Sequence, residues 1–347
     1  MPTDRLPAIL AVGLCSPLGA TFAETARRYA AGERAQRFER ALVGADGLPP
    51  TLAQAIPIAE CRDYGRRLRR LLAAALADCA GRVPPPPGGW LLRLTVRPEL
   101  CEHPDRDAFR ASLLEPHAGL LRDLDLLPGG PAEALSDLAH AAVAVRDGAE
   151  DHVLVGALDS AIHPLLLDRL AVEERILMRG NPWGLIPGEA AVVMALGLET
   201  GEPAHGPGRG AVLGVFRGVE EEDVAAPRGL IGRGLAKAFA RGARFLPPDR
   251  LLADLTGERW RAEEFGVAVA RAAAPEAGIA ALAADPETPA LHLGDCGTAA
   301  GLLLPALALA DPPPRAAAGP VAMVSVSSRE TGARAVGFVE RCGAGAA

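Results

Sequence analysis

Hydrophobic residues recur along this chain with two different periods. In residues 64–80, Leu68, Leu71, Leu72 and Leu76 fall on one face of a helix, because an α-helix turns once every 3.6 residues. Short apolar runs bounded by glycine or proline predict strands instead. The strands expected from this pattern cover residues 8–14, 90–96, 152–158, 190–196, 211–216, 251–255, 291–293, 321–327 and 335–339. The expected helices cover residues 21–31, 64–80, a segment beginning near 105, 131–146, 229–241, 261–273 and 298–309.

The order of these elements predicts the architecture. Strands alternate with helices along the chain, which is typical of α/β layers. Similar strand–helix series occur in both halves and suggest an internal duplication. The 347 residues are a typical length for two fused or duplicated domains. We therefore expect an N-terminal half in residues 1–200 and a C-terminal half in residues 201–347.

The composition indicates a soluble globular protein, with 49% hydrophobic and 23% charged residues. The formal net charge is −7, which argues against a nucleic-acid partner, since nucleic-acid binders usually present a basic surface. No uninterrupted apolar run reaches about 18 residues, the length that crosses a bilayer, and the first residues lack the pattern of a signal peptide. We expect a cytoplasmic protein that binds no membrane.

The cysteines and glycines exclude several common sites. No C-x-x-C pair and no Cys/His cluster with zinc spacing occurs, so we expect no metal, no cofactor and reduced thiols that pack as small hydrophobes. The sequence contains no G-x-x-x-x-G-K-[ST] loop, no strand-bound G-x-G-x-x-G unit and no G-x-S-x-G elbow, which removes the obvious nucleotide and hydrolase interpretations. The six cysteines are Cys15, Cys61, Cys79, Cys101, Cys296 and Cys342.

Five ordered segments resemble one family. They are residues 9–19 (ILAVGLCSPLG), 144–160 (AVRDGAEDHVLVGALDS), 186–191 (IPGEAA), 294–301 (GDCGTAAG) and the terminal hairpin at 321–339. In order and spacing they resemble the β-ketoacyl synthases of the thiolase superfamily. That resemblance implies a duplicated, five-layer αβαβα thiolase-like fold, which in the family is usually a dimer.

The same resemblance marks three catalytic positions, and none of them holds the family residue. Pro131 stands where the family has a nucleophilic cysteine, at a helix N-terminus that favours the thiolate. Asp254 and Asp295 stand where it has two histidines that stabilise developing negative charge. An ionised aspartate cannot donate a hydrogen bond to an oxyanion. We therefore expect a non-condensing protein without the Cys-His-His triad.

The two aspartates converge if the resemblance holds. Two close carboxylates raise one of their pKa values unless a cation lies between them, and Arg259, Arg261 or Arg329 would supply that cation. We favour the interpretation of a structural ion-pair cluster in an emptied site. A ligand or partner site, and hydrolytic or metal chemistry, are the alternatives.

Cys296 is the one thiol near the expected pocket. It is either a replacement nucleophile or a buried, inert cysteine at the start of a helix. We favour the second interpretation, because the adjacent carboxylate of Asp295 raises the pKa of a thiol.

Residues 254–266 replace a catalytic loop of the family with charged and aromatic side chains. Tryptophan and arginine are common anchors of protein interfaces. The alternative is a packed loop in which Trp260 and Phe265 lie in the core. The candidate binding or pocket residues are Cys296, Arg329, Glu330, Arg259, Trp260 and Arg261.

Three hypotheses for function follow. Residues 254–266 and the short chain resemble ketosynthase-like proteins of bacterial type VI secretion effector clusters, which implies an adaptor that helps to load a secreted effector. The second hypothesis is a chain-length-factor-like subunit that pairs with an active ketosynthase. The third is a residual acyl-thioester enzyme that uses Asp254, Asp295 or Cys296. The partners implied are a homodimer or heterodimer mate, a secretion effector or adaptor, or an active ketosynthase with its acyl carrier protein.

Overall fold

The computed structural model describes residues 7–44, 46–198, 206–221, 232–272, 277–314, 316 and 319–342. Within them lie eleven strands, nine of which form one mixed sheet. The strands are β1 (Pro7–Cys15), β2 (Arg37–Phe38), β3 (Thr51–Leu52), β4 (Trp90–Val96), β5 (Leu121–Pro128), β6 (His152–Ser160), β7 (Glu189–Leu198), β8 (Gly210–Val219), β9 (Arg250–Ala253), β10 (Val321–Ser327) and β11 (Ala333–Arg341).

The helices of the described residues connect and cover these strands. Those that matter most below are α2, which follows β3, α5, which follows β5, α7, which follows β8, and α11, which directly precedes β10. The α-helices are α1 (Phe22–Ala30), α2 (Tyr64–Ala80), α3 (Pro98–Glu102), α4 (Arg106–Leu114), α5 (Pro131–Arg146), α6 (Pro164–Val172), α7 (Arg233–Gly242), α8 (Arg259–Ala272), α9 (Ala277–Ala284), α10 (Ala290–Leu293) and α11 (Ala300–Ala308), and two 3-10 turns, η1 and η2, cover Glu115–His117 and Gly297–Ala299.

The strand order shows the duplication that the sequence suggested. The sheet runs β5-β4-β6-β7-β1-β8-β11-β10-β9. In the first half β4 and β6 are parallel, and β6–β7 and β7–β1 are antiparallel. In the second half β9 and β10 are parallel, and β10–β11 and β11–β8 are antiparallel. The two halves therefore repeat one strand pattern, and they join where β1 pairs with β8.

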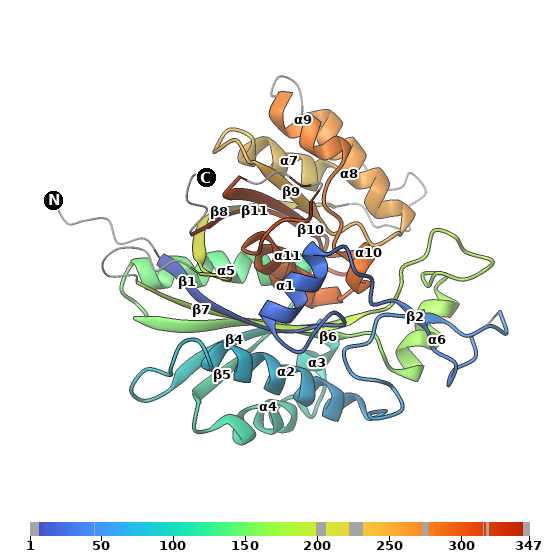
Figure 1. The fold of residues 1–347 in the computed structure, drawn as a ribbon, viewed down its shortest axis with the longest axis horizontal. Helices are drawn as coiled ribbons and strands as arrows, with labels where there is room; N and C mark the ends of the chain where they lie inside the picture. Colours follow the sequence, from blue (N-terminus) through green and yellow to red (C-terminus); the bar gives the residue numbers. More distant parts are fainter. Residues whose placement is uncertain are drawn as a thin grey trace.

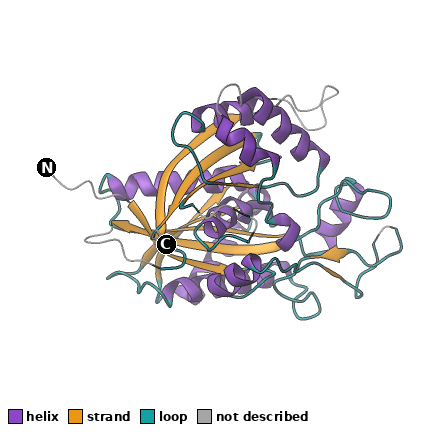
Figure 2. Ribbon diagram, turned by 45° about the horizontal axis from the view of Figure 1, so that its top comes forward, coloured by secondary structure: helices purple, strands orange, loops and turns teal. Residues whose placement is uncertain are grey.

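The elements stack in five layers (Figure 1). Helix α2 covers the outer face of the first half of the sheet, and α7 and α8 cover the outer face of the second half. Between the two halves lie α5 and α11, which contact each other and strands of both halves. Figure 2 shows these helices alternating with the curved sheet. This is the thiolase-like αβαβα arrangement that the sequence predicted.

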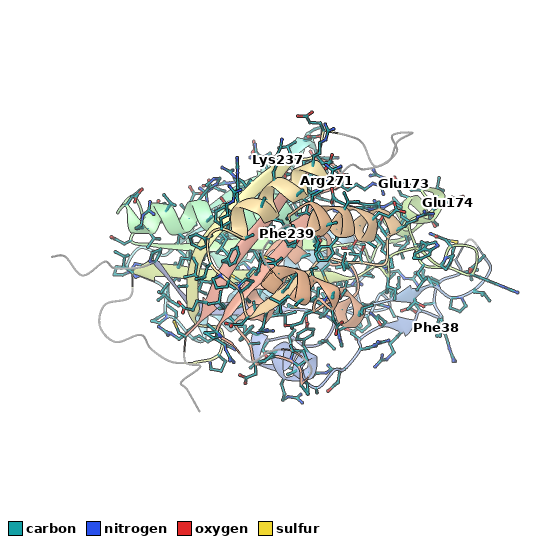
Figure 3. All side chains as sticks on the ribbon, turned by 90° about the horizontal axis from the view of Figure 1, so that it is seen from above. Phe38, Glu173, Glu174, Lys237, Phe239 and Arg271 are labelled. Atoms are coloured by element: carbon teal, nitrogen blue, oxygen red, sulfur yellow. The ribbon has the colours of Figure 1, made fainter. Side chains whose placement is uncertain are left out.

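The apolar pattern of each helix fits its layer. All nine residues of α11 are buried, as expected for a helix enclosed on every side. Helix α7 is two-sided: Phe239 packs edge-on against Phe265 of α8, while Lys237 points outward (Figure 3). Glycine at 218 lets α7 approach β8, because a Cβ there would lie 1.9 Å from the Gly234 carbonyl oxygen.

Most predicted elements are confirmed, one is wrong, and several elements, among them α3, α6 and α9, were not predicted. Helices α2 and α5 have the predicted bounds. Residues 291–293, expected to be a strand, lie instead in the one-turn helix α10, which ends at Gly294 with φ +70°. Strand β5 was not predicted. The expected boundary at residue 200 and the start of the helix expected at 229 lie outside the described residues. None of the described helices is long and apolar enough to span a bilayer.

Candidate functional site

The first half and the second half of the chain meet at a narrow cleft with a volume of about 100 Å³. It lies at the N-terminus of α5, beside the end of β6, the start of α11 and the turn between β10 and β11. Five of the residues predicted for the site line it: Pro131, Arg261, Asp295, Arg329 and Glu330. The structure therefore brings together residues that are up to 199 positions apart in the sequence.

The N-terminus of α5 carries no thiol. The helix begins at Pro131, which is tolerated there because the first N–H of a helix has no intrahelical acceptor. The next amide, that of Ala132, donates to the Ser328 hydroxyl at 3.0 Å, and that hydroxyl donates to Glu133 at 2.6 Å. The Gly130 amide also donates to Glu133, at 2.9 Å. Side chains of the protein itself thus occupy the donors that would otherwise hold an anion.

Asp254 lies at the end of β9 and is ion-paired with Arg261. Its Oδ2 accepts hydrogen bonds from the Arg261 guanidinium at 2.5 Å and from the Ser327 amide at 2.8 Å. The same guanidinium nitrogen donates to the Ser327 carbonyl at 2.9 Å. Burial raises the pKa of Asp254 to about 6, although Arg261 and the Ser327 amide lower it. Of the three predicted cations, Arg261 is the one that meets this carboxylate.

A second carboxylate, that of Glu258, is ion-paired with three guanidiniums. It pairs with Arg175 at 2.8 Å, Arg261 at 3.5 Å and Arg329 at 3.6 Å. Burial raises the pKa of Glu258, but Arg175 and Arg261 outweigh it and hold that pKa below its ordinary value. Burial and repulsion from Arg175 lower the pKa of Arg329. Arg329 is therefore held in the cleft by Glu258, as part of a cluster of alternating charges.

Asp295 and Cys296 directly precede the 3-10 turn η2, which leads into α11. The Asp295 carboxylate accepts a hydrogen bond from the Gly297 amide at 2.9 Å, and burial raises its pKa. It lines a small cavity together with Asp254 and Cys296, so the two aspartates do converge. The Cys296 thiol is 2% exposed and contacts the carbonyl oxygens of Leu293 and Gly294. Burial, and then Asp295, raise the pKa of Cys296 well above its ordinary value.

Two further predicted residues point elsewhere. Arg259 was a candidate cation for the cleft, but its side chain is 71% exposed and pairs with Glu263 one turn along α8. Trp260 is half-buried, and its ring lies against the guanidiniums of Arg261, at 4.5 Å, and Arg334, at 5.7 Å. Phe265 is buried. Arg259 and Arg261 are two residues apart on α8 and therefore point about 200° apart, which is why only one of the two arginines enters the site.

Sequence reasoning missed Asp159 and Arg97. The Asp159 carboxylate, at the end of β6, accepts hydrogen bonds from Arg97 at 2.5 Å and from the amide of Thr298 at 2.9 Å. Both Arg97 and Asp159 line the cleft. A polar residue directly after a buried run of β6 was the available signal for Asp159, whereas Arg97 follows β4 in a segment that showed no motif.

The arrangement is one of paired charges without a nucleophile beside a base. Among the residues that the structure describes, those lining the cleft include no cysteine and no histidine. No group of three or more metal-ligating side chains occurs in the described part of the chain. Each buried guanidinium is instead neutralised by a carboxylate, which is how proteins tolerate charges out of water.

Comparisons with known proteins give the class of fold. No protein-family profile and no curated protein sequence matches the chain. Solved structures do match over almost its whole length, and ketosynthases and ketosynthase/chain length factor complexes are among them. The fold is therefore the thiolase-like fold of these proteins, at a sequence identity that shows the fold alone.

Three of these structures illustrate the likeness. A chain of "AntDE:AntF (apo): type II PKS acyl-carrier protein in complex with its ketosynthase bound to the hexaketide" matches with a TM-score of 0.76 at 13% identity, over 98% of this chain and 100% of that one. A chain of the ishigamide ketosynthase/chain length factor matches with a TM-score of 0.73 at 16% identity, over 98% and 100%. The complex of the ketosynthase ApeO with its chain length factor ApeC from Xenorhabdus doucetiae gives a TM-score of 0.66 at 14% identity, over 99% and 99%.

Proposed function

We propose that this chain is a non-condensing, chain-length-factor-like subunit that pairs with an active ketosynthase in fatty-acid or polyketide-type synthesis in the cytoplasm. The observation that carries the proposal is the residue at the N-terminus of α5. This position lines the cleft and holds Pro131. A condensing enzyme needs a thiolate there to form the acyl thioester. The thiol nearest to the cleft, Cys296, is buried, and its pKa is raised.

The charges in the cleft support this proposal. Asp254 and Asp295, at the two positions where the sequence resemblance places histidines, are buried carboxylates held by Arg261 and by the Gly297 amide. An ionised carboxylate repels the enolate and oxyanion that condensation generates, so these residues would raise the barrier that histidines lower. The site is consistent with a fold retained for assembly and not for turnover.

The full-length likeness to proteins that act in pairs also supports the proposal. Two of the matching structures are complexes of a ketosynthase with a chain length factor, and one contains an acyl carrier protein. Transferred to this chain, the partners would be an active ketosynthase and, through it, an acyl carrier protein.

Co-expression with the ketosynthase encoded nearest to it in the genome tests the proposal. We expect a stable complex of one copy of each chain in size-exclusion chromatography, and a change in the length of the acyl product when this chain is left out. Intact-mass spectrometry after incubation with acyl-CoA and acyl-carrier-protein thioesters is the second measurement. An acyl adduct on this chain, or a partner ketosynthase that neither binds it nor changes its product, would overturn the proposal.

The other two hypotheses remain predictions with separate tests. The adaptor for type VI secretion rested on Trp260 and its neighbours as interface anchors, but the Trp260 ring packs against Arg261 and Arg334 inside the molecule. Co-purification with a secretion spike component or effector would favour that role. A residual enzyme predicts thioester turnover that Asp254→Ala or Asp295→Ala abolishes.

A further inference from the structure

A second hollow, of about 790 Å³, lies on the other side of α6 from the cleft. Arg169 and Leu170 of this helix line the cleft, whereas Leu167 and Val172 line the hollow. Small-molecule sites measure about 300–1,000 Å³, so the hollow has the size of such a site and the cleft, at about 100 Å³, does not. We call the hollow the α6 groove. In Figure 1 α6 lies beside β2, and the remaining walls of the groove come from residues 38–44, 46–51 and 176–182.

The walls of the α6 groove are apolar. Leu167 is buried and belongs to a small apolar cluster that is separate from the cores of the two halves. Eleven large apolar side chains are exposed in the described residues, and four of them line this one groove: Phe38, Val43, Leu48 and Val172. Exposed apolar side chains that gather in one place, unlike single scattered ones, mark a binding site.

The polar side chains of the α6 groove are Asp46, Thr51, Asp168 and Arg179. Both carboxylate oxygens of Asp46 are occupied, because they accept the main-chain amides of Leu48 at 3.1 Å and Arg179 at 3.2 Å. Asp168 is exposed to water. The guanidinium of Arg179 is also exposed, and it makes no hydrogen bond and no ion pair within the described residues. It is the one cation among the described residues that line the groove, and its N–H donors suit a carboxylate, which a guanidinium binds through two parallel hydrogen bonds.

We propose that the α6 groove binds a free long-chain fatty acid, with the alkyl chain against the apolar walls and the carboxylate on Arg179. An alkyl chain in the groove would remove Phe38, Val43 and Val172 from water, which is the main source of affinity for such a ligand. The guanidinium of Arg179 would supply the charge that complements the head group. The inference does not rest on the proposed function, since the groove lies across α6 from the cleft and needs neither a ketosynthase nor an acyl carrier protein.

Calorimetric titration of the full chain with octanoate, decanoate, dodecanoate and tetradecanoate tests the ligand class. The dissociation constant should fall by about fourfold for each added CH₂, until the alkyl chain fills the groove. Dodecanol lacks the charge and should bind about threefold to fivefold more weakly than dodecanoate, since the ion pair with Arg179 is exposed. Dodecylamine should bind more weakly still. An amine that binds more tightly than the carboxylate would place the head group on Asp168 and overturn the proposal.

Two exposed positions locate the ligand without a risk to folding. Val172→Asn, at a side chain that is 84% exposed, should weaken the binding of dodecanoate and of dodecanol by at least about fivefold. Arg179→Ala should weaken dodecanoate by about threefold to fivefold and leave dodecanol unchanged. The matched controls are Val219→Asn and Arg259→Ala, which change exposed residues outside the groove and should alter neither ligand.

Two results would overturn the proposal. Dodecanoate that binds equally to all four variants would lie outside the α6 groove. No binding of any of the four carboxylates at about 1 mM would leave the groove to a different occupant, such as an apolar segment of another protein.

Discussion

Arg261 and Asp254 form an ion pair at 2.5 Å in which both side chains are less than 10% exposed. The two residues lie seven positions apart, one at the start of α8 and the other after β9. The guanidinium also approaches Glu258, and its Nε has no hydrogen-bond partner. A single buried cation therefore faces two carboxylates, which makes Arg261 the centre of the charge cluster.

Replacing Arg261 by methionine should destabilise the protein by about 3–5 kcal/mol, because it leaves Asp254 and Glu258 buried with less compensation. Urea unfolding followed by circular dichroism measures this change. The matched control is Arg259→Met, two residues earlier on the same helix, whose exposed pair with Glu263 should be worth less than about 1 kcal/mol. Equal losses in the two variants would show that Arg261 has no special place in the cluster.

Stability should fall with rising pH through the titration of Asp254. Its pKa is about 6 in the folded chain and is expected near 3.8 in the unfolded chain, so the folded state holds the proton more tightly. The contribution is fully present below about pH 4 and is lost as pH rises through about 6, with a total of about 3 kcal/mol. The difference in unfolding free energy between the unmodified protein and Asp254→Asn, measured from pH 4 to 7, isolates this slope. A difference that grows with pH would contradict the sign.

The sequence predicted elements whose ends carry local signals. Helix α2 begins after Asp63, whose carboxylate accepts the Arg66 amide at 2.6 Å as an N-cap, and α5 begins at Pro131. Strand β5 was missed because charged residues interrupt it on the exposed side of an edge strand. Residues 291–293 alternate too briefly to tell a strand from one turn of helix.

The site was predictable in outline only. The sequence resemblance brought Pro131, Asp254 and Asp295 to one place, because fold topology fixes where the ends of buried strands and helices meet. It did not reveal that Arg175 reaches Glu258, since those residues are 83 positions apart and no spacing rule connects them. The sequence also did not show whether Arg259 or Arg261 enters the cleft. That depends on the residue at which α8 begins, which sets the direction of each side chain.

Thiol reactivity should follow burial. Burial raises the pKa of both Cys15 and Cys79 to about 12, and that of Cys296 well above its ordinary value. At pH 8 the thiolate of Cys15 or Cys79 should be about a thousand times scarcer than that of an ordinary cysteine. Labelling with iodoacetamide followed by peptide mass spectrometry should modify the half-buried Cys101 and Cys342 first, and Cys296 only after unfolding. Rapid labelling of Cys296 in the folded protein would instead support the hypothesis that Cys296 is a nucleophile.

Among the glycines that line the cleft, Gly297 should tolerate substitution least. Its φ is +54°, and a Cβ there would lie 2.1 Å from the Asp159 carboxylate oxygen that accepts the Thr298 amide. Gly297→Ala would therefore strain the backbone and push Asp159 away from this amide, at a cost of about 3 kcal/mol in unfolding free energy. Gly266→Ala is the control, because a Cβ at that helical, exposed position meets no atom within 4 Å and should stabilise α8 by about 1 kcal/mol. The midpoint of thermal or urea unfolding should thus shift in opposite directions for the two variants. An equal loss of unfolding free energy in both would mean that the position of Asp159 does not require glycine at 297.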